Sequence, residues 1–181
     1  VVEIEKETSL LGGAGNVINN LKSLGANVDV ISVIGDDLIA EELKLLLSSI
    51  RVSPKMLIKE QNRTTSKKSR IMASQQQVLR YDKESVIDIN LNSQSQIIDC
   101  FQNVIKNYSV VLFSDYGKGV FTYSLTKELI KIANKNHVKV LVDPKGTNYS
   151  KYEGAYLLTP NKKEAFDATK IKIKNKNSLE K

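Results

Sequence analysis

Residues 110–119 read VVLFSDYGKG, an apolar run followed directly by polar and glycine residues. A short apolar run rich in β-branched residues is typical of a buried strand, and polar residues begin at Ser114 where the strand ends. The same order recurs at Asp143-Pro144-Lys145 and at Thr159-Pro160-Asn161. Ligands of open parallel sheets bind outside the carboxyl ends of the strands. We therefore expect three successive strands to deliver polar groups to one active-site edge.

Helical and strand patterns alternate on both sides of this stretch, which predicts a mostly parallel sheet flanked by helices. The expected helices are Gly15–Leu24, Leu38–Ser49, about Ser95–Lys106 and about Tyr123–Asn134, with a last element from Asn161. The expected strands of the main sheet are Val28–Ile34, Val110–Phe113, Val138–Val142 and Ala155–Leu158. The fold class is therefore α/β.

The middle of the chain interrupts this alternation. Met56–Ile58, Ser69–Ala73 and Gln77–Tyr81 have the pattern of short strands, and no helical pattern separates them. We interpret residues 56–83 as a small antiparallel sheet inserted in the α/β chain. Arg80 alternates with Leu79 and Tyr81, so it is expected on the opposite face from them.

Composition narrows the class of protein. The chain has 181 residues, enough for one domain with a core, and a net charge of +7. Lysines are spread along the sequence and aromatics make up only 6%, so we interpret the charge as serving anionic substrates and not nucleic acid. No apolar run is long enough for a membrane span. The single cysteine, Cys100, is expected to be a buried structural thiol, in keeping with a cytoplasmic location.

Two glycine-rich segments are candidates for ligand binding, and each has a purely structural alternative. Gly12-Gly13-Ala14-Gly15-Asn16 stands before a helix, where it either binds a sugar or makes a tight turn. Lys118 lies between glycines after a strand, where it either reaches a phosphate or is simply solvated.

Three further candidates carry charge. Asp143 and Lys145 either steer a phosphate with its magnesium or pair with each other. Asn161 and Glu164 either lie beside a triphosphate or form a capping box for the last helix. Arg80 either binds a sugar phosphate or lies free on the surface.

The order of these segments resembles a known family. Gly12–Asn16, Leu24-Gly25-Ala26 and Gly35-Asp36-Asp37 together resemble the amino-terminal signature of the PfkB, or ribokinase-like, carbohydrate kinases. Asn161-x-x-Glu164 resembles the magnesium- and phosphate-linked N-x-x-E motif of that superfamily. Within it, four longer strings resemble the D-glycero-β-D-manno-heptose 7-phosphate kinases of ADP-heptose and lipopolysaccharide synthesis: Val78–Asp82, Ser114–Gly119, Val142–Thr147 and Leu157–Asn161.

The resemblance implies a ribokinase-like fold, ATP and Mg²⁺ as cofactors, a sugar phosphate as acceptor, and a homodimer formed through the antiparallel lid sheet. It also implies roles for individual residues. The sugar would be held by Gly12, Gly13, Asn16, Arg80 and Asp115. The phosphoryl-transfer site would be supported by Lys118, Asp143 and Lys145. ATP would contact Asn161, Lys162, Lys163 and Glu164, and Glu164 would hold magnesium through water.

The sequence also departs from the family pattern. Ser74–Gln77 replaces an expected Arg-Asn-Gln-Gln run, and the G-x-G-D motif that carries the catalytic Asp does not occur. The first strand, with its sugar-binding Asp, is also not recognised. We therefore expect residues 1–181 to be a partial kinase domain, inactive alone, with the catalytic C-terminal part outside it. Three alternatives stay open: Asp115 or Asp143 as the base, a kinase for another sugar, and a non-catalytic fragment that dimerises or binds a ligand.

Overall fold

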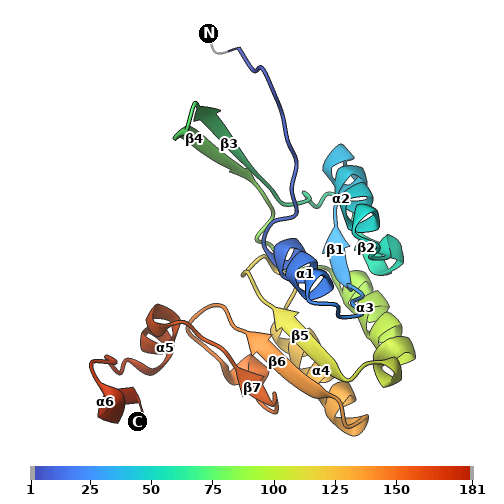
Figure 1. Cartoon of the computed structure of the whole chain (residues 1–181). Coiled ribbons are helices and arrows are strands. Elements are labelled where there is room, and N and C mark those ends of the chain that lie inside the picture. Colours follow the sequence, from blue (N-terminus) through green and yellow to red (C-terminus); the bar gives the residue numbers. More distant parts are fainter. Residues whose placement is uncertain (1–2, 180–181) are drawn as a thin grey trace.

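The computed structural model describes residues 3–179. Figure 1 shows parallel strands with helices packed around them and a two-stranded hairpin that projects away. The α-helices are α1 (Ala14–Ser23), α2 (Leu38–Ser49), α3 (Leu91–Val104), α4 (Tyr123–Lys135), α5 (Lys162–Thr169) and α6 (Lys176–Leu179). The strands are β1 (Ser32–Ile34), β2 (Leu57–Lys59), β3 (Lys67–Ala73), β4 (Gln76–Lys83), β5 (Val110–Ser114), β6 (Lys139–Asp143) and β7 (Leu157–Leu158). Three 3₁₀ turns, Pro54–Met56, Ile105–Asn107 and Ser150–Tyr152, complete the described elements.

The parallel strands fall into two sheets. β1 pairs with β2, and β6 lies between β5 and β7, all in parallel. The register aligns Ser114 at the end of β5 with Asp143 at the end of β6. This alignment places the polar strand ends at one edge, as the sequence predicted.

The antiparallel sheet is smaller than the sequence predicted. Leu57–Lys59 pairs with β1, so the expected lid strand at Met56–Ile58 belongs to the parallel part of the fold. Only β3 and β4, residues 67–83, form the antiparallel hairpin, which we call the lid. The physical reason is burial: Ile58 is 8% exposed and packs in the main core beside Val33. A three-residue apolar run cannot by itself indicate which sheet it joins.

The two faces of the lid differ in chemistry. Opposite partners in an antiparallel pair share a face. Ile71 pairs with Leu79, whereas Arg70 pairs with Arg80. Leu79 and Arg80 are neighbours in a strand, so they point to opposite faces, as expected. The lid therefore has a charged face and an opposite face that carries Ile71, Leu79 and Tyr81 and ends at its base in Lys67 and Lys83; we call the latter the apolar face.

The main core lies between the β5–β6–β7 sheet and the helices α3 and α4. Val140 and Val142 of β6 are fully buried, and Phe113 of β5 packs in the same cluster as Phe101 of α3. Figure 1 shows α4 behind β5 and β6. The buried side chains of this core hold β5 and β6 in place, and they therefore also hold the carboxyl ends of these two strands. Cys100 is only partly buried, less than expected, and its burial raises the pKa of the thiol.

Candidate active site

Backbone hydrogen bonds hold the three strand ends together. The Asp115 amide donates to the Asp143 carbonyl over 3.0 Å, and the Thr159 amide donates to the Val142 carbonyl over 2.9 Å. Asp143 is therefore flanked by the chain that leaves β5 and by the chain that leaves β7. This confirms that parallel pairing gathers these segments at one edge.

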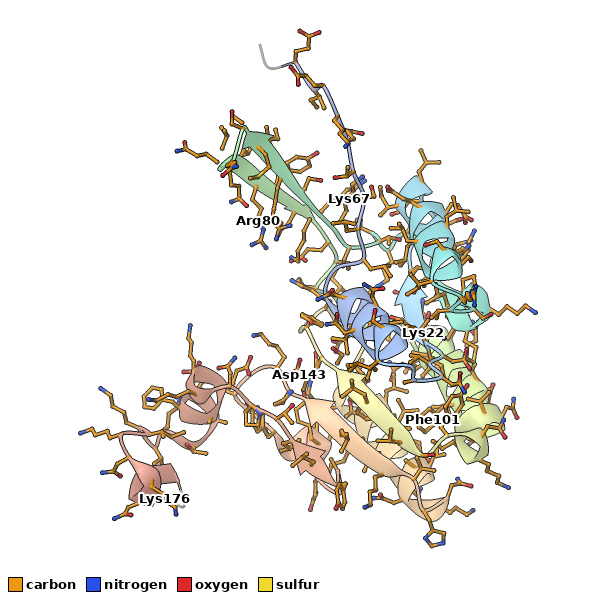
Figure 2. The ribbon with its side chains drawn as sticks, in the orientation of Figure 1. Lys22, Lys67, Arg80, Phe101, Asp143 and Lys176 are labelled. Atoms are coloured by element: carbon orange, nitrogen blue, oxygen red, sulfur yellow. The ribbon has the colours of Figure 1, made fainter. Side chains whose placement is uncertain are left out.

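Asp143 is the carboxylate that stands out electrostatically. Burial raises the pKa of Asp143, and the negative charges of Glu164 and Asp115 raise it further, against a lowering effect of Lys145. Lys145 pairs with Glu164 across 3.1 Å. Asp143, Lys145 and Glu164 thus form one charged cluster, drawn from the end of β6 and the start of α5. Figure 2 shows Asp143 at the end of its strand.

The start of α5 forms the capping box that the sequence allowed. The Asn161 side chain accepts hydrogen bonds from the amides of Lys163 and Glu164, both at 3.0 Å. The Glu164 carboxylate accepts in turn from the Asn161 amide over 3.0 Å. This contact and Lys145 lower the pKa of Glu164, so it is ionised at neutral pH. Lys162 and Lys163 are exposed beside this cap, and the ATP roles of all four residues remain predictions.

The side chain of Asp115 holds the loop after β5 in place. Its side chain is 3% exposed, and it accepts hydrogen bonds from Lys151 Nζ, the Tyr152 hydroxyl and the Gly117 amide, all at 2.7 Å. Tyr152 is also buried, and its pKa is raised by burial and by the bond to Asp115. These contacts fix the loop after β5. The predicted contact of Asp115 with substrate stays a prediction.

The amino-terminal glycines lie next to the same loop. Gly13 has a φ of 51°, and a Cβ built there would lie 3.7 Å from the Tyr116 ring. Gly13 also stands at the N-cap of α1 without a side-chain cap, and Asn16 is exposed in the first turn. Gly12 has open space around it. The glycine segment and the β5 loop are therefore neighbours, as a shared site requires.

A series of ion pairs joins the lid to the β5 loop. Arg80 forms a two-pronged pair with Asp82, at 2.9 and 2.7 Å. Lys68 bridges Asp82 and Glu84 at 2.8 and 2.9 Å, and Glu84 also pairs with Lys118. The structure thus brings Lys118 to the lid, while Figure 2 shows Arg80 on the projecting hairpin, apart from Asp143.

Some buried polar residues in and around this edge belong to no recognisable sequence motif. Tyr149 and Ser114 have buried hydroxyls without a hydrogen-bond partner among residues 3–179. Burial raises the pKa of Tyr149, with further contributions from the negative charges of Glu164, Asp167 and Asp143. Arg63 and Glu60 form a buried ion pair at 3.5 Å. No motif indicated these residues, because the burial of the Tyr149 and Ser114 hydroxyls and the contacts of Arg63 with the Ile87 and Lys118 carbonyls arise only in the folded chain.

The carboxylates at this edge decide whether the site suits magnesium. Within the described part of the chain, no group of three His, Cys, Asp or Glu side chains could hold a metal ion. Mg²⁺ at kinase sites uses one or two carboxylates, with waters and substrate phosphates completing its shell. The repulsion between Asp143 and Glu164 is the kind that a divalent cation relieves. Asp143 and Glu164 are the carboxylates of this cluster, and a magnesium role for them remains a prediction.

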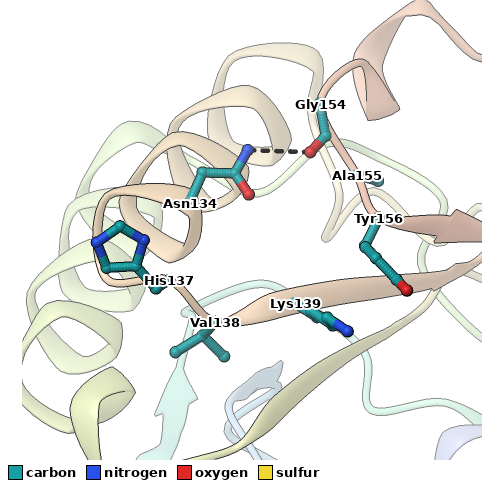
Figure 3. A pocket seen from close by; sticks show the side chains of 7 residues that line it. All are labelled: Asn134, His137, Val138, Lys139, Gly154, Ala155 and Tyr156. Carbon is teal, nitrogen blue, oxygen red and sulfur yellow. Dashed lines mark hydrogen bonds between the residues drawn. The ribbon is translucent and has the colours of Figure 1, made fainter.

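A shallow hollow of about 510 Å³ lies elsewhere, at the opposite end of β6. Figure 3 shows His137, Lys139 and Tyr156 around it, with the Asn134 amide donating to the Gly154 carbonyl over 2.9 Å. Lys139 Nζ lies 4.2 Å from the centroid of the Tyr156 ring. Because Lys139 begins β6 and Asp143 ends it, this hollow is separate from the candidate site.

No helix in the described part is long and apolar enough to cross a membrane. A family model described as pfkB family carbohydrate kinase matches residues 1–181. The bifunctional protein HldE of Aliarcobacter butzleri is 65% identical over 179 residues, 99% of this chain and 38% of that protein. The bifunctional protein HldE of Sulfurimonas denitrificans is 54% identical over 179 residues, with the same coverage. The chain thus spans about 38% of the length of these curated relatives.

Solved structures share the fold at low sequence identity. Ribokinase of Arabidopsis thaliana, complexed with ribose and ATP, gives a TM-score of 0.71 at 14% identity, covering 99% of this chain and 58% of that one. The tetrameric inhibited form of Escherichia coli phosphofructokinase-2 gives 0.70 at 18% identity, covering 98% and 61%. The expected ribokinase-like architecture is confirmed.

Proposed function

The chain belongs to the pfkB family of carbohydrate kinases, and on that premise we propose that the whole protein phosphorylates D-glycero-D-manno-heptose 7-phosphate at its anomeric hydroxyl. The observation that carries the proposal is the charged cluster of Asp143, Lys145 and Glu164 at the strand ends. The 65% identity to a bifunctional protein HldE supports the choice of a heptose phosphate. We place the reaction in the cytoplasm, where ATP is available.

In the proposed reaction the anomeric oxygen attacks the γ-phosphorus of ATP. A new P–O bond forms to the sugar, the P–O bond to ADP breaks, and the hydroxyl proton passes to a base. We propose that this base lies outside residues 1–181, so this chain alone is inactive. Positioned charge supplies most of the catalysis in phosphoryl transfer. Lys118 and Lys145 would offset charge on the phosphates.

The other residues take binding roles in this proposal. Gly12, Gly13 and Asn16 would hold the sugar hydroxyls, and the exposed Lys162 and Lys163 would contact ATP. Asp143 would hold Mg²⁺ together with Glu164, which would act through a water molecule. The bound ion would neutralise charge on the phosphates. Arg80, on the charged face of the lid, would bind the 7-phosphate, because its planar guanidinium suits a phosphate bidentately. In the absence of substrate, Asp82 occupies that guanidinium.

A homodimer through the lid is part of the proposal. The lid stands apart from the main body, and Leu79 and Tyr81 on its apolar face are 51% and 55% exposed. A thin hairpin of two strands is marginal by itself and gains stability by packing a face. A second lid would supply that packing.

The proposal is tested on the whole protein with ATP and three competing acceptors: heptose 7-phosphate, fructose 6-phosphate and ribose. We expect a strong preference for heptose 7-phosphate. Arg80→Ala should raise the KM for it about tenfold or more, because a hydrogen bond to a charged group contributes about 1.5–3 kcal/mol. Arg51→Ala, an exposed arginine outside the lid, is the matched control. Preference for ribose, unaffected by Arg80→Ala, would overturn the substrate and leave the family unchanged.

A further inference from the structure

Arg63 is buried where the lid joins the main body. Its side chain is 5% exposed and that of Glu60 is 9% exposed, whereas Arg51, Arg70 and Arg80 are exposed. Burying a guanidinium is costly unless its donors are paired. The acceptors that pair the buried Arg63 guanidinium therefore indicate its role.

Those contacts join three segments. Two of them are the lid linkers, residues 60–66 before β3 and 84–90 after β4. The third is the loop after β5 that carries Lys118. Arg63 donates to the carbonyl of Ile87 over 3.1 Å and to the carbonyl of Lys118. Glu60 completes the arrangement, because its second oxygen accepts from the Asn90 amide over 3.0 Å.

Glycines allow these segments to approach closely. A Cβ on Gly119 would lie 2.0 Å from the Ile87 carbonyl oxygen, and Gly119 has a φ of 75°. The Ile89 amide donates to the Gly119 carbonyl over 3.0 Å. A Cβ on Gly35, at the end of β1, would lie 2.1 Å from the Arg63 carbonyl oxygen. The linkers, the β5 loop and the β1 end are thus packed without spare room.

Lys118 is consequently held from two sides. Its carbonyl accepts from Arg63, and its ammonium pairs with Glu84 at the base of the lid. Only an arginine can serve this geometry, because a planar fork with five donors reaches two carbonyls and a carboxylate together. A lysine there would keep the charge beside Glu60 and lose the bridge.

We propose that Arg63, supported by Glu60, is a positioning residue for the kinase reaction: it ties both lid linkers to the Lys118 loop. The proposal rests on the proposed function, because Lys118 matters only if phosphoryl transfer occurs at this edge. Arg63 touches neither sugar nor ATP in this account. It acts through the placement of Lys118 and of the lid's charged face.

A double-mutant cycle in the whole protein tests the route through Lys118. Arg63→Lys should lower kcat/KM about tenfold or more, and in a Lys118→Ala background the same change should cost less than about threefold. Arg63→Met is measured in parallel, and Arg63→Lys keeps the test valid if the methionine variant does not fold. Arg51→Lys is the control. Equal losses in both backgrounds would show a general stability effect and overturn the proposal.

Amide hydrogen exchange gives a readout that needs no activity. Arg63→Lys should speed exchange at residues 84–90 and 117–119 by about tenfold, with α4 unchanged, because local opening follows the loss of local ties. Unchanged exchange in both segments would refute the tie. If the unmodified protein phosphorylates none of the three acceptors, the proposed function fails, while the exchange result still decides the role of Arg63.

Discussion

At the scale of single residues, Asp143 carries a charge that its surroundings disfavour. Burial, Glu164 and Asp115 raise the pKa of Asp143 above 3.8. A raised carboxyl pKa means that the ionised form costs folding free energy at neutral pH, and that this cost vanishes below the unfolded pKa. Asp143→Asn should therefore stabilise the fold at pH 7 and give no gain below pH 3.8. Urea unfolding across this pH range measures the effect.

The same substitution should impair catalysis. Loss of a charge that holds magnesium or orients phosphates typically costs about 100-fold or more in kcat. Asp99→Asn, on an exposed residue of α3, is the control and should change neither stability nor rate. If Asp143→Asn loses stability at pH 7, the electrostatic account of Asp143 is contradicted. If Asp143→Asn keeps full activity, Asp143 is not part of the active site.

Asp115 should behave in the opposite way. Asp115→Ala leaves Lys151 without its carboxylate and the Tyr152 hydroxyl without its acceptor, in a region where Tyr152 is 2% exposed. Breaking a buried ion pair on one side costs about 3–5 kcal/mol. We expect denaturant unfolding to show a loss near this size. A stable variant with only a raised sugar KM would instead support a direct substrate contact.

At the scale of elements, local chemistry made the helices predictable. The bounds of α2 match the prediction because Asp37 caps it, its side chain accepting from the Ala40 amide. α1 stops as expected because Gly25, at a φ of 87°, closes it. Strands were harder: Val28–Ile34 was expected, but only Ser32–Ile34 pairs. Strand pairing depends on distant partners, and a short apolar run does not specify them.

The candidate site was predictable to the same extent. Asp143 and Glu164 were found because parallel strands must bring their carboxyl ends to one edge, which is a topological rule. Arg63 was not, because the two carbonyls that it bridges are 24 and 55 residues away in sequence. Residues that act through the local backbone can be read from a sequence, whereas those that join distant loops need the folded chain.

Helix α5 is short and has no buried residue. It has eight residues and buries none of them, so its stability depends on its ends. Asn161→Ala removes the acceptor for two amides and should cost about 1 kcal/mol. Amide exchange at Lys163 and Glu164 should quicken accordingly. Lys170, the C-cap, has a φ of 61°, so Lys170→Gly should offset part of the loss by relieving left-handed backbone strain. Unchanged exchange in Asn161→Ala would show that another contact maintains α5.

At the scale of the whole molecule, the described residues leave two apolar surfaces open. One is the face of the β5–β6–β7 sheet turned away from the core, where Leu112 and Leu157 are 41% and 48% exposed. The other is the apolar face of the lid. Open apolar faces of this kind mark contacts with further protein. The lid is the more informative of the two, because its opposite face carries Arg80.

The proposed lid interface can be tested by a substitution that leaves Arg80 unchanged. Leu79→Asp places a charge on the apolar face, opposite Ile71 and away from Arg80. If the lids pair, the whole protein should change from dimer to monomer in light scattering, with Kd weakened about thirtyfold, the effect of a 2 kcal/mol hot spot. Leu45→Asp, on a residue of α2 that is 72% exposed, should leave the dimer intact. A Leu79→Asp protein that remains dimeric would exclude the lid as the interface, and the apolar sheet face would become the next surface to test.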